Sequence, residues 1–454
     1  MWLTMTKIQR INNYKPYISN NTKVDSPKTG AGIPFVQPEL KKVSAENLQA
    51  YVPSFAKASK NSAPTQKEQM KKIKSKLDSE ALKDFKELQQ KGILLDNSSN
   101  DGSTVLDNLY KIVTEPRIVG LSDSLILKET LKALNNPPSI TQKFGDIPDQ
   151  VANEIAKETG TPFPERAKNV VSSSCVVTSI EFNMASQTPA EFARFVQGLS
   201  GADYSVTKNV KISSLGDGMA SSLYMLREFN TEHSIANNWE DVTIKIQPDR
   251  NAIIRSRVQS SYKDPNERSC VDVLIQSALL NLGSQHTYDA LTDERTGKFN
   301  NDKTGLTEFE KTFVEEVVFD KPKLSVVYQS LDQNGVLVGY NAEMEEVKQH
   351  ILKSLNLGQN VIIGYTQFDE NKKVLGGHEI TIVGYEQDAN GNGVFVCNDT
   401  DDDLNQLIKV SETELLPLIH HAGISKEALS ENDVVEVPWR VVLQQIQELI
   451  KQNP

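Results

Sequence analysis

Three short apolar segments, at 360–368, 379–385 and 393–398, constrain the fold of this chain more than any other feature of its sequence. They are rich in β-branched residues and bounded by turn residues, which is typical of strands. The turn 388-DANGNG-393 joins the last two, and its Asn-Gly dipeptides favour the positive φ of a hairpin. An amphipathic helix, 341–358, is predicted just before them, with an Asn at its start and a Gly at its end. The expected fold class is therefore α+β.

Helical periodicity dominates the rest of the chain. The apolar spacing and the glycine stops predict helices at 66–92, 104–113, 122–135, 147–160, about 170–198 and 269–283. Apolar and polar residues alternate over 241–256, and this pattern predicts a hairpin instead of a helix. The tail, 411–454, is expected to be mainly helical, with a short strand at 433–437.

The length of 454 residues suggests two or three domains. Changes in composition and periodicity divide the chain into four parts. We expect a disordered basic arm at 1–64, a helical region at 65–160 that is a pro-segment or accessory domain, a catalytic domain at 161–410 with a large insertion at about 200–340, and a helical C-terminal extension at 411–454.

The net charge and the cysteine content limit the possible compartment and partners of the protein. Residues 1–75 carry 13 Lys or Arg and 4 Asp or Glu, whereas the whole chain has a net charge of -11. We interpret this basic head as a solvated arm rather than a nucleic-acid-binding or membrane-binding element. The sequence contains no long apolar segment and no signal-peptide pattern, and its three cysteines are too sparse for a disulfide framework. The expected location is cytoplasmic, or secreted without a cleaved signal peptide.

Cys175 is the first candidate catalytic residue. It follows three serines and opens a helical pattern in 172-SSSCVVTSIEFNMAS-186. A helix N-terminus favours a thiolate, because its free N–H groups and its dipole attract negative charge. Cys270 also begins a predicted helix and is closer in sequence to the candidate histidine, so it remains a rival for the nucleophile.

His378 is the candidate base. It follows Gly376 and Gly377 and opens the strand 379-EITIVGY-385. An imidazole that activates a thiol needs an amide or carboxylate on its other nitrogen. The hairpin folds Asn398 and Asp399 back towards His378, and alternation along a strand allows only one of the two to face it.

The order of these residues, a Cys at a helix head, a His at a strand and an Asn or Asp after the next strand, resembles the papain-like cysteine peptidase fold. The stretches 345–365 and 376–399 are most similar to bacterial double-glycine-leader peptidases. The resemblance implies a helix-borne Cys packed on an antiparallel sheet that carries His and Asn or Asp. Papain-like enzymes place an oxyanion-stabilising Gln six residues before the nucleophile, and Asn169 occupies that position here.

The resemblance implies a soluble bacterial thiol hydrolase, with a cysteine peptidase that cleaves peptide or isopeptide bonds as the leading hypothesis. An acyltransferase or deamidase with the same triad, and an inactive papain-fold binding or effector protein, remain alternatives. The sequence shows no nucleotide-binding motif, and its histidines form no zinc-ligand spacing with its cysteines. We therefore expect no cofactor, no metal and no nucleic-acid partner. The expected partner is a peptide or protein substrate; the sequence does not indicate an oligomeric state.

Overall fold

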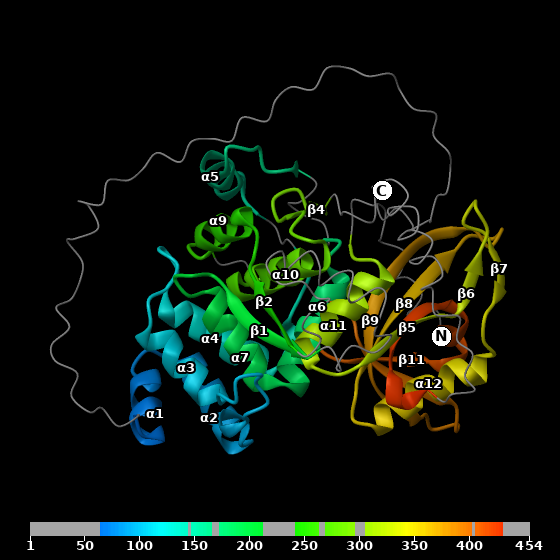
Figure 1. Cartoon of the computed structure of the whole chain (residues 1–454), viewed down its shortest axis with the longest axis horizontal. Helices are drawn as coiled ribbons and strands as arrows, with labels where there is room; N and C mark the ends of the chain where they lie inside the picture. The colour runs from blue at the N-terminus through cyan, green and yellow to red at the C-terminus, as the bar shows by residue number, and fades with distance from the viewer. Residues whose placement is uncertain are drawn as a thin grey trace.

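The computed structural model describes residues 64–143, 147–165, 172–211, 241–262, 268–295, 305–401 and 405–429. Within these residues the protein is a mixed structure of twelve α-helices and antiparallel β-sheets, in agreement with the α+β prediction. Most helices gather on one side of the molecule and the largest sheet lies on the other (Figure 1). None of the helices in the described ranges has the length and apolar character that crossing a bilayer requires.

The N-terminal helices begin where side chains can satisfy their first backbone N–H groups. Thr65 and Glu68 form a capping box at the first helix, and Thr104 and Asp107 form another at the third. The single helix predicted over 66–92 is instead two helices, because the Asp78 side chain caps a second start. The five helices of this region are α1 (Gln66–Lys74), α2 (Ser79–Gln90), α3 (Val105–Thr114), α4 (Asp123–Asn135) and α5 (Asp149–Thr159).

Two predictions for the middle of the chain are corrected by the structure. The helix expected near 170–198 is broken at Pro189, which starts a new helix at a position where its missing N–H costs nothing. The hairpin expected over 241–256 is a strand followed by a helix, because Asp249 accepts from two backbone N–H groups and starts a helix there. The elements here are α6 (Cys175–Gln187), α7 (Pro189–Leu199), β1 (Val206–Lys211), β2 (Asp241–Ile246), α9 (Arg250–Gln259), α10 (Cys270–Gly283) and α11 (Glu308–Phe319).

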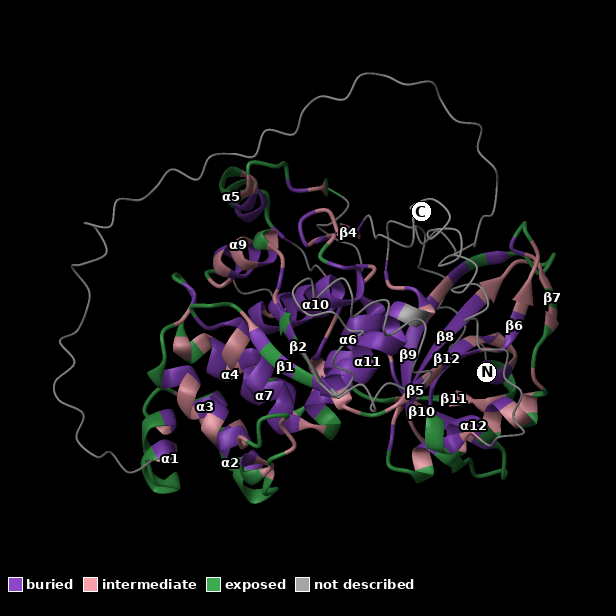
Figure 2. Cartoon of the chain, viewed as in Figure 1, coloured by how far each residue is buried: buried purple, intermediate pink, exposed green. Residues whose placement is uncertain are grey.

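One hydrophobic core joins these helices. It runs without interruption from Ile73 in α1 through α3, α4, α6, α7, α10 and α11 to Ile362 in the large sheet. Figure 2 shows that α6 and α10 are buried along most of their length. Helices α1 to α4 of the predicted 65–160 region therefore share one core with α6 and α10, whereas α5 packs with α9 in a separate small core.

The large sheet has six strands in the order β11-β10-β9-β8-β12-β5, and every neighbouring pair is antiparallel. The three strands predicted at 360–368, 379–385 and 393–398 are confirmed and lie side by side as β8, β9 and β10. The strands are β5 (Lys323–Val327), β8 (Val361–Phe368), β9 (Val374–Gln387), β10 (Gly393–Asn398), β11 (Ile408–Ser411) and β12 (Ile419–Ser425).

Two further corrections concern β5 and β12. Residues 419–425, expected in a helical extension, form an interior strand of the sheet between β8 and β5. Residues 323–327, expected in an insertion, form its edge strand. Both segments are short runs that a local pattern does not distinguish, so only their pairing in the sheet identifies them. The predicted helix 44–52 and strand 433–437 lie outside the described residues.

The two faces of the sheet are covered by different helices. Ile362 faces the core that contains α6, α10 and α11, whereas its neighbours Val361 and Ile363 face a second core that contains the helix predicted at 341–358. Successive side chains of a strand point to opposite faces of the sheet, which explains this division along β8. The remaining elements are α12 (Met344–Asn356), α13 (Glu412–Leu415), and the short strand pairs β3 (Tyr288–Asp289) with β4 (Glu294–Arg295) and β6 (Gln329–Leu331) with β7 (Leu337–Tyr340).

Candidate active site

Cys175 lies at the first position of α6, as the sequence predicts. The serines before it do not cap the helix through their side chains, and among the described residues no side chain caps this end. They anchor the approach instead: the backbone N–H of Ser173 donates to Asp293 at 2.7 Å, and the Ser174 hydroxyl donates to Gln276 at 3.2 Å. These two contacts hold the start of α6 in place, and the first backbone N–H groups of the helix remain uncapped by these side chains.

His378 lies within β9, opposite Tyr365 of β8. Its Nε2 is 2.8 Å from Asp399 Oδ1, just beyond the end of β10. Its side chain also makes a hydrogen bond with that of Cys175. The imidazole therefore lies between a carboxylate on one side and a thiol on the other, which is the arrangement that thiol activation needs.

The same contacts control the protonation of the imidazole. Burial opposes the charged ring, but the Asp399 carboxylate and the hydrogen bonds that the ring makes with Asp399 and Cys175 outweigh it, and the pKa of His378 is raised well above its usual value. Burial likewise raises the pKa of Asp399, and the His378 charge reverses this, so that the net pKa of Asp399 is lowered. Histidinium and carboxylate are thus the favoured forms of this pair.

The structure distinguishes the two candidate orienting residues. Asp399 contacts His378, whereas the Asn398 side chain is buried and its Nδ2 has no hydrogen-bond partner among the described residues. A register shift between Val396 and Cys397 in β10 changes which side chains face β9 at the end of the hairpin. The sequence pattern does not show this irregularity.

The two candidate nucleophiles have different surroundings. Cys270 lies at the first position of α10, but its Sγ donates to the backbone carbonyl of Ser256 in α9 at 3.2 Å. Both cysteines are buried, and the contact with α9 is what makes Cys270 part of the helix packing. Cys175 is the cysteine whose side chain meets His378.

Tyr365 was not among the residues singled out from the sequence. Its ring packs edge-on against His378, with 5.8 Å between the ring centroids. Burial, with smaller contributions from Asp399, Asp401 and Cys175, raises the pKa of Tyr365 to about 12, so its hydroxyl keeps its proton and can donate. The pairing of the strands predicted at 360–368 and 379–385 was the signal that could have placed it beside His378.

Two further features were singled out from the sequence: Asn169 and the turn 388–393. Asn169, the candidate oxyanion donor, lies outside the described residues. The turn 388–393 closes the β9–β10 hairpin, where the Asp388 side chain accepts from the backbone of Asn390 and Asn392, and Gly391 has a φ of 83°. The turn is therefore held by its own hydrogen bonds, as the Asn-Gly pattern predicts.

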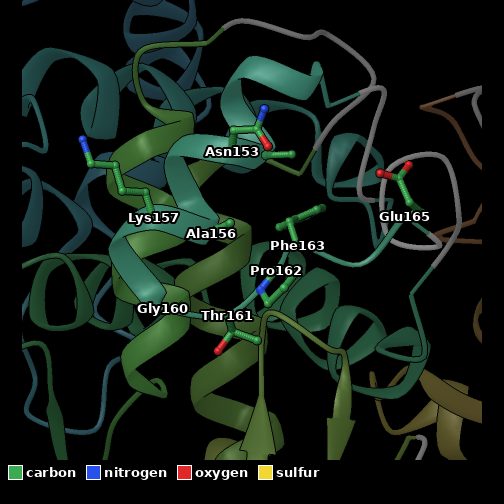
Figure 3. A pocket seen from close by; sticks show the side chains of 9 residues that line it. Asn153, Ala156, Lys157, Gly160, Thr161, Pro162, Phe163 and Glu165 are labelled. Atoms are coloured by element: carbon green, nitrogen blue, oxygen red, sulfur yellow. The ribbon is translucent and has the colours of Figure 1, made fainter.

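A pocket of about 550 Å³ is lined by residues of α5 and of the segment that follows it (Figure 3). Cys175, His378 and Asp399 do not line it, and no cysteine or histidine does. Its walls are formed by Ala152, Asn153, Ala156, Lys157, Gly160, Thr161, Pro162, Phe163 and Glu165. The pocket therefore supplies no group for the thiol chemistry.

The site can activate a thiol, hold a proton on the neighbouring imidazole and fix that imidazole with a carboxylate. Each group comes from a separate element: the head of α6, the strand β9 and the residue after β10. Comparison with known proteins adds no identification: no protein-family model matches the chain, and no curated protein matches its sequence.

Proposed function

We propose that this protein is a papain-like thiol hydrolase, and specifically a cysteine peptidase that cleaves peptide or isopeptide bonds. The observation that carries the proposal is the position of His378 between the Asp399 carboxylate, at 2.8 Å, and the Cys175 thiol. Thiol, imidazole and carboxylate in this order form the minimum set for nucleophilic acyl transfer.

In the proposed reaction, the Cys175 thiol gives its proton to His378, and the sulfur attacks the carbonyl carbon of the substrate. A new S–C bond forms and the carbonyl oxygen becomes an oxyanion. When the tetrahedral intermediate collapses, the C–N bond breaks and His378 donates its proton to the leaving amine. Water then attacks the thioester with His378 as the base, which releases the acid and restores the thiol.

Asp399 supports both directions of this proton transfer. Its contact with Nε2 leaves the other ring nitrogen, Nδ1, to serve the Cys175 thiol. Its negative charge stabilises the imidazolium that forms when the thiol is deprotonated, and its pKa is lowered by the same interaction. Asp399, rather than Asn398, is therefore the third residue of the proposed triad.

The head of α6 is the proposed oxyanion site. Its first N–H groups point along the helix axis, where no side chain of the described residues caps them. Backbone N–H groups of this kind stabilise a developing negative charge without reorganisation. Among them, the backbone N–H of Cys175 lies on the nucleophile itself, as expected for a thiol hydrolase.

One observation favours the alternative of an inactive papain-fold binding protein. Cys175 and His378 are only 4% and 6% exposed. A substrate carbonyl has to reach the sulfur, so chemical accessibility separates the two proposals. If the pair is closed to small electrophiles, the fold serves binding rather than catalysis.

The test compares Cys175→Ala with Cys270→Ala in the full chain. Peptide mass spectrometry follows iodoacetamide labelling of each cysteine, and a peptide library follows cleavage. We expect fast labelling at Cys175, slow labelling at Cys270, and loss of cleavage in Cys175→Ala alone. Labelling of Cys175 no faster than that of Cys270, together with unchanged cleavage in Cys175→Ala, would contradict the proposal.

A further inference from the structure

A second group of polar side chains lies at the sheet, where the start of α11 meets β12. Glu308 comes from α11, and His420 and His421 come from β12. Each offers one donor atom, and the three atoms lie within 4.8 Å of one another. None of the three belongs to the proposed triad. Two imidazoles and a carboxylate are the ligand types that zinc and similar dications prefer.

Two of the three ligand-atom separations in this cluster fit a shared ion. His420 Nδ1 and His421 Nδ1 are 3.1 Å apart, and Glu308 Oε1 is 3.7 Å from His420 Nδ1. With zinc–ligand distances near 2.0–2.1 Å, two ligand atoms of a tetrahedral ion are roughly 3.3–3.4 Å apart. Both observed separations therefore lie within a few tenths of an ångström of that geometry.

An irregularity in β12 brings the two rings together. Consecutive residues of a regular strand point to opposite faces, so His420 and His421 would normally diverge. The register against β8 shifts between Ile419, which pairs with Tyr365, and His421, which pairs with Gly364. A bulge of this kind redirects a side chain, and the two rings meet edge-on with their centroids 5.3 Å apart.

Glu379 orients His421 from the other side. Its Oε1 lies 2.7 Å from His421 Nε2. Its other oxygen, Oε2, lies 3.5 Å from the Lys311 Nζ. A carboxylate beside Nε2 favours the proton on that nitrogen and leaves the Nδ1 lone pair for the cluster.

The backbone is shaped to admit the His421 ring. A Cβ at position 364 would lie 2.2 Å from His421 Cε1 and 2.9 Å from Glu379 Oε1. Only a glycine in β8 leaves this space. The ring of His421 thus lies directly against the sheet backbone, which fixes its direction.

The charged groups around the cluster suit a cation. Glu308 and Glu379 bring two negative charges, and Lys311, whose Nζ is 3.5 Å from Glu379 Oε2, brings one positive charge. The nearby charges therefore leave an excess of one negative charge for an ion to neutralise.

We propose that Glu308, His420 and His421 bind one zinc-type divalent transition-metal ion, which ties the first turn of α11 to β12. Three protein ligands leave a fourth position for water. The sequence did not predict this site, because Glu308 is far from the two histidines along the chain and their spacing matches no zinc motif. The proposal does not depend on the peptidase proposal, since no residue is shared.

The test measures zinc binding to the full chain in a Cys175→Ser background, which removes the thiol that could itself bind zinc beside His378. Calorimetry of the chelator-treated protein is expected to give one zinc ion per chain, with an increase in Tm. His420→Ala and Glu308→Gln should each weaken binding by at least about 10-fold. Cobalt should give visible absorption bands of tetrahedral coordination in the parent only.

His286→Asn is the matched control. His286 is an exposed histidine outside the cluster with a φ of 61°, a conformation that Asn adopts readily. Zinc binding should be unchanged in this variant. Glu308→Gln keeps the side-chain volume, so circular dichroism can verify that it remains folded. The proposal is overturned if the parent binds no zinc, or if folded Glu308→Gln and His420→Ala bind it as tightly as the parent.

Discussion

Replacement of Asp399 by Asn tests the carboxylate–imidazole pair directly. The change removes the negative charge 2.8 Å from His378 Nε2 but keeps a side chain of the same size with an acceptor oxygen. Both side chains are largely buried, at 5% and 20% exposure, so solvent screens the lost charge only partly. The main effect is therefore on the charge state of His378 rather than on packing.

The magnitude follows from the electrostatics of a close pair. An opposite charge within about 4–6 Å changes a pKa by roughly 1–3 units, and each unit corresponds to about 1.4 kcal/mol. Without Asp399, burial again opposes the charged ring, and the pKa of His378 falls. The population of the thiolate–imidazolium pair at neutral pH should decrease by about 10- to 1000-fold.

The sign of the pH dependence is also fixed. The pKa of His378 is raised in the folded protein. The positive charge of His378 therefore stabilises the fold fully at pH values below the usual histidine pKa, and this stabilisation is lost as the pH rises through the pKa of the folded protein. The imidazolium beside Cys175 should therefore persist towards alkaline pH in the parent. In Asp399→Asn, the imidazolium should disappear at a lower pH.

The assay is the rate of iodoacetamide labelling at Cys175 between about pH 5 and 9, read by peptide mass spectrometry, since it needs no known substrate. Cys270 in the same molecule is an internal reference. Asn398→Ser is the control variant, because the Asn398 Nδ2 has no partner among the described residues. The reasoning is refuted if Asp399→Asn labels as fast as the parent, or if Asn398→Ser produces the loss instead.

Two further predictions concern stability. Gly364→Ala should destabilise the fold by about 1–3 kcal/mol, because the new Cβ would lie 2.2 Å from His421 Cε1. Gly384→Ala is the control, since its new Cβ would lie 3.7 Å from its nearest atom. Thermal unfolding compares the two variants, and an equal Tm would contradict the prediction. Burial and the neighbouring Asp272 raise the pKa of Glu181 well above its usual range, so the folded state keeps a proton that the unfolded state releases. The free energy of unfolding should fall by up to about 1.4 kcal/mol per pH unit above the ordinary carboxyl range, and urea titrations should show a weaker pH dependence in Glu181→Gln.

Local pattern was sufficient for the elements that carry the candidate site. The helix head at Cys175, the strand at His378 and the hairpin around 388–393 were predicted because each depends on residues close in sequence. Periodicity, caps and turn residues act over a few positions, and these elements satisfy them without conflict. The same reasoning failed at 241–256, where a single capping aspartate, Asp249, converts an alternating segment into a helix.

Long-range pairing was beyond the reach of the sequence pattern. The choice between Asn398 and Asp399 depended on a register shift in β10, and the position of β12 inside the sheet depended on its pairing with β8 and β5. Such pairings bring together residues that are distant in sequence, and no local signal records them. The cluster of Glu308 with His420 and His421 has the same origin.

By itself, the sequence determined which side chains are capable of thiol chemistry and which local elements hold them. Only the tertiary structure decided their combination: it brings Cys175, rather than Cys270, to His378 and gives Asp399, rather than Asn398, the contact with the ring. The physical reason is that reactivity depends on distances of about 3 Å between atoms, and the packing of α6 against the sheet, not the spacing of residues along the chain, sets those distances.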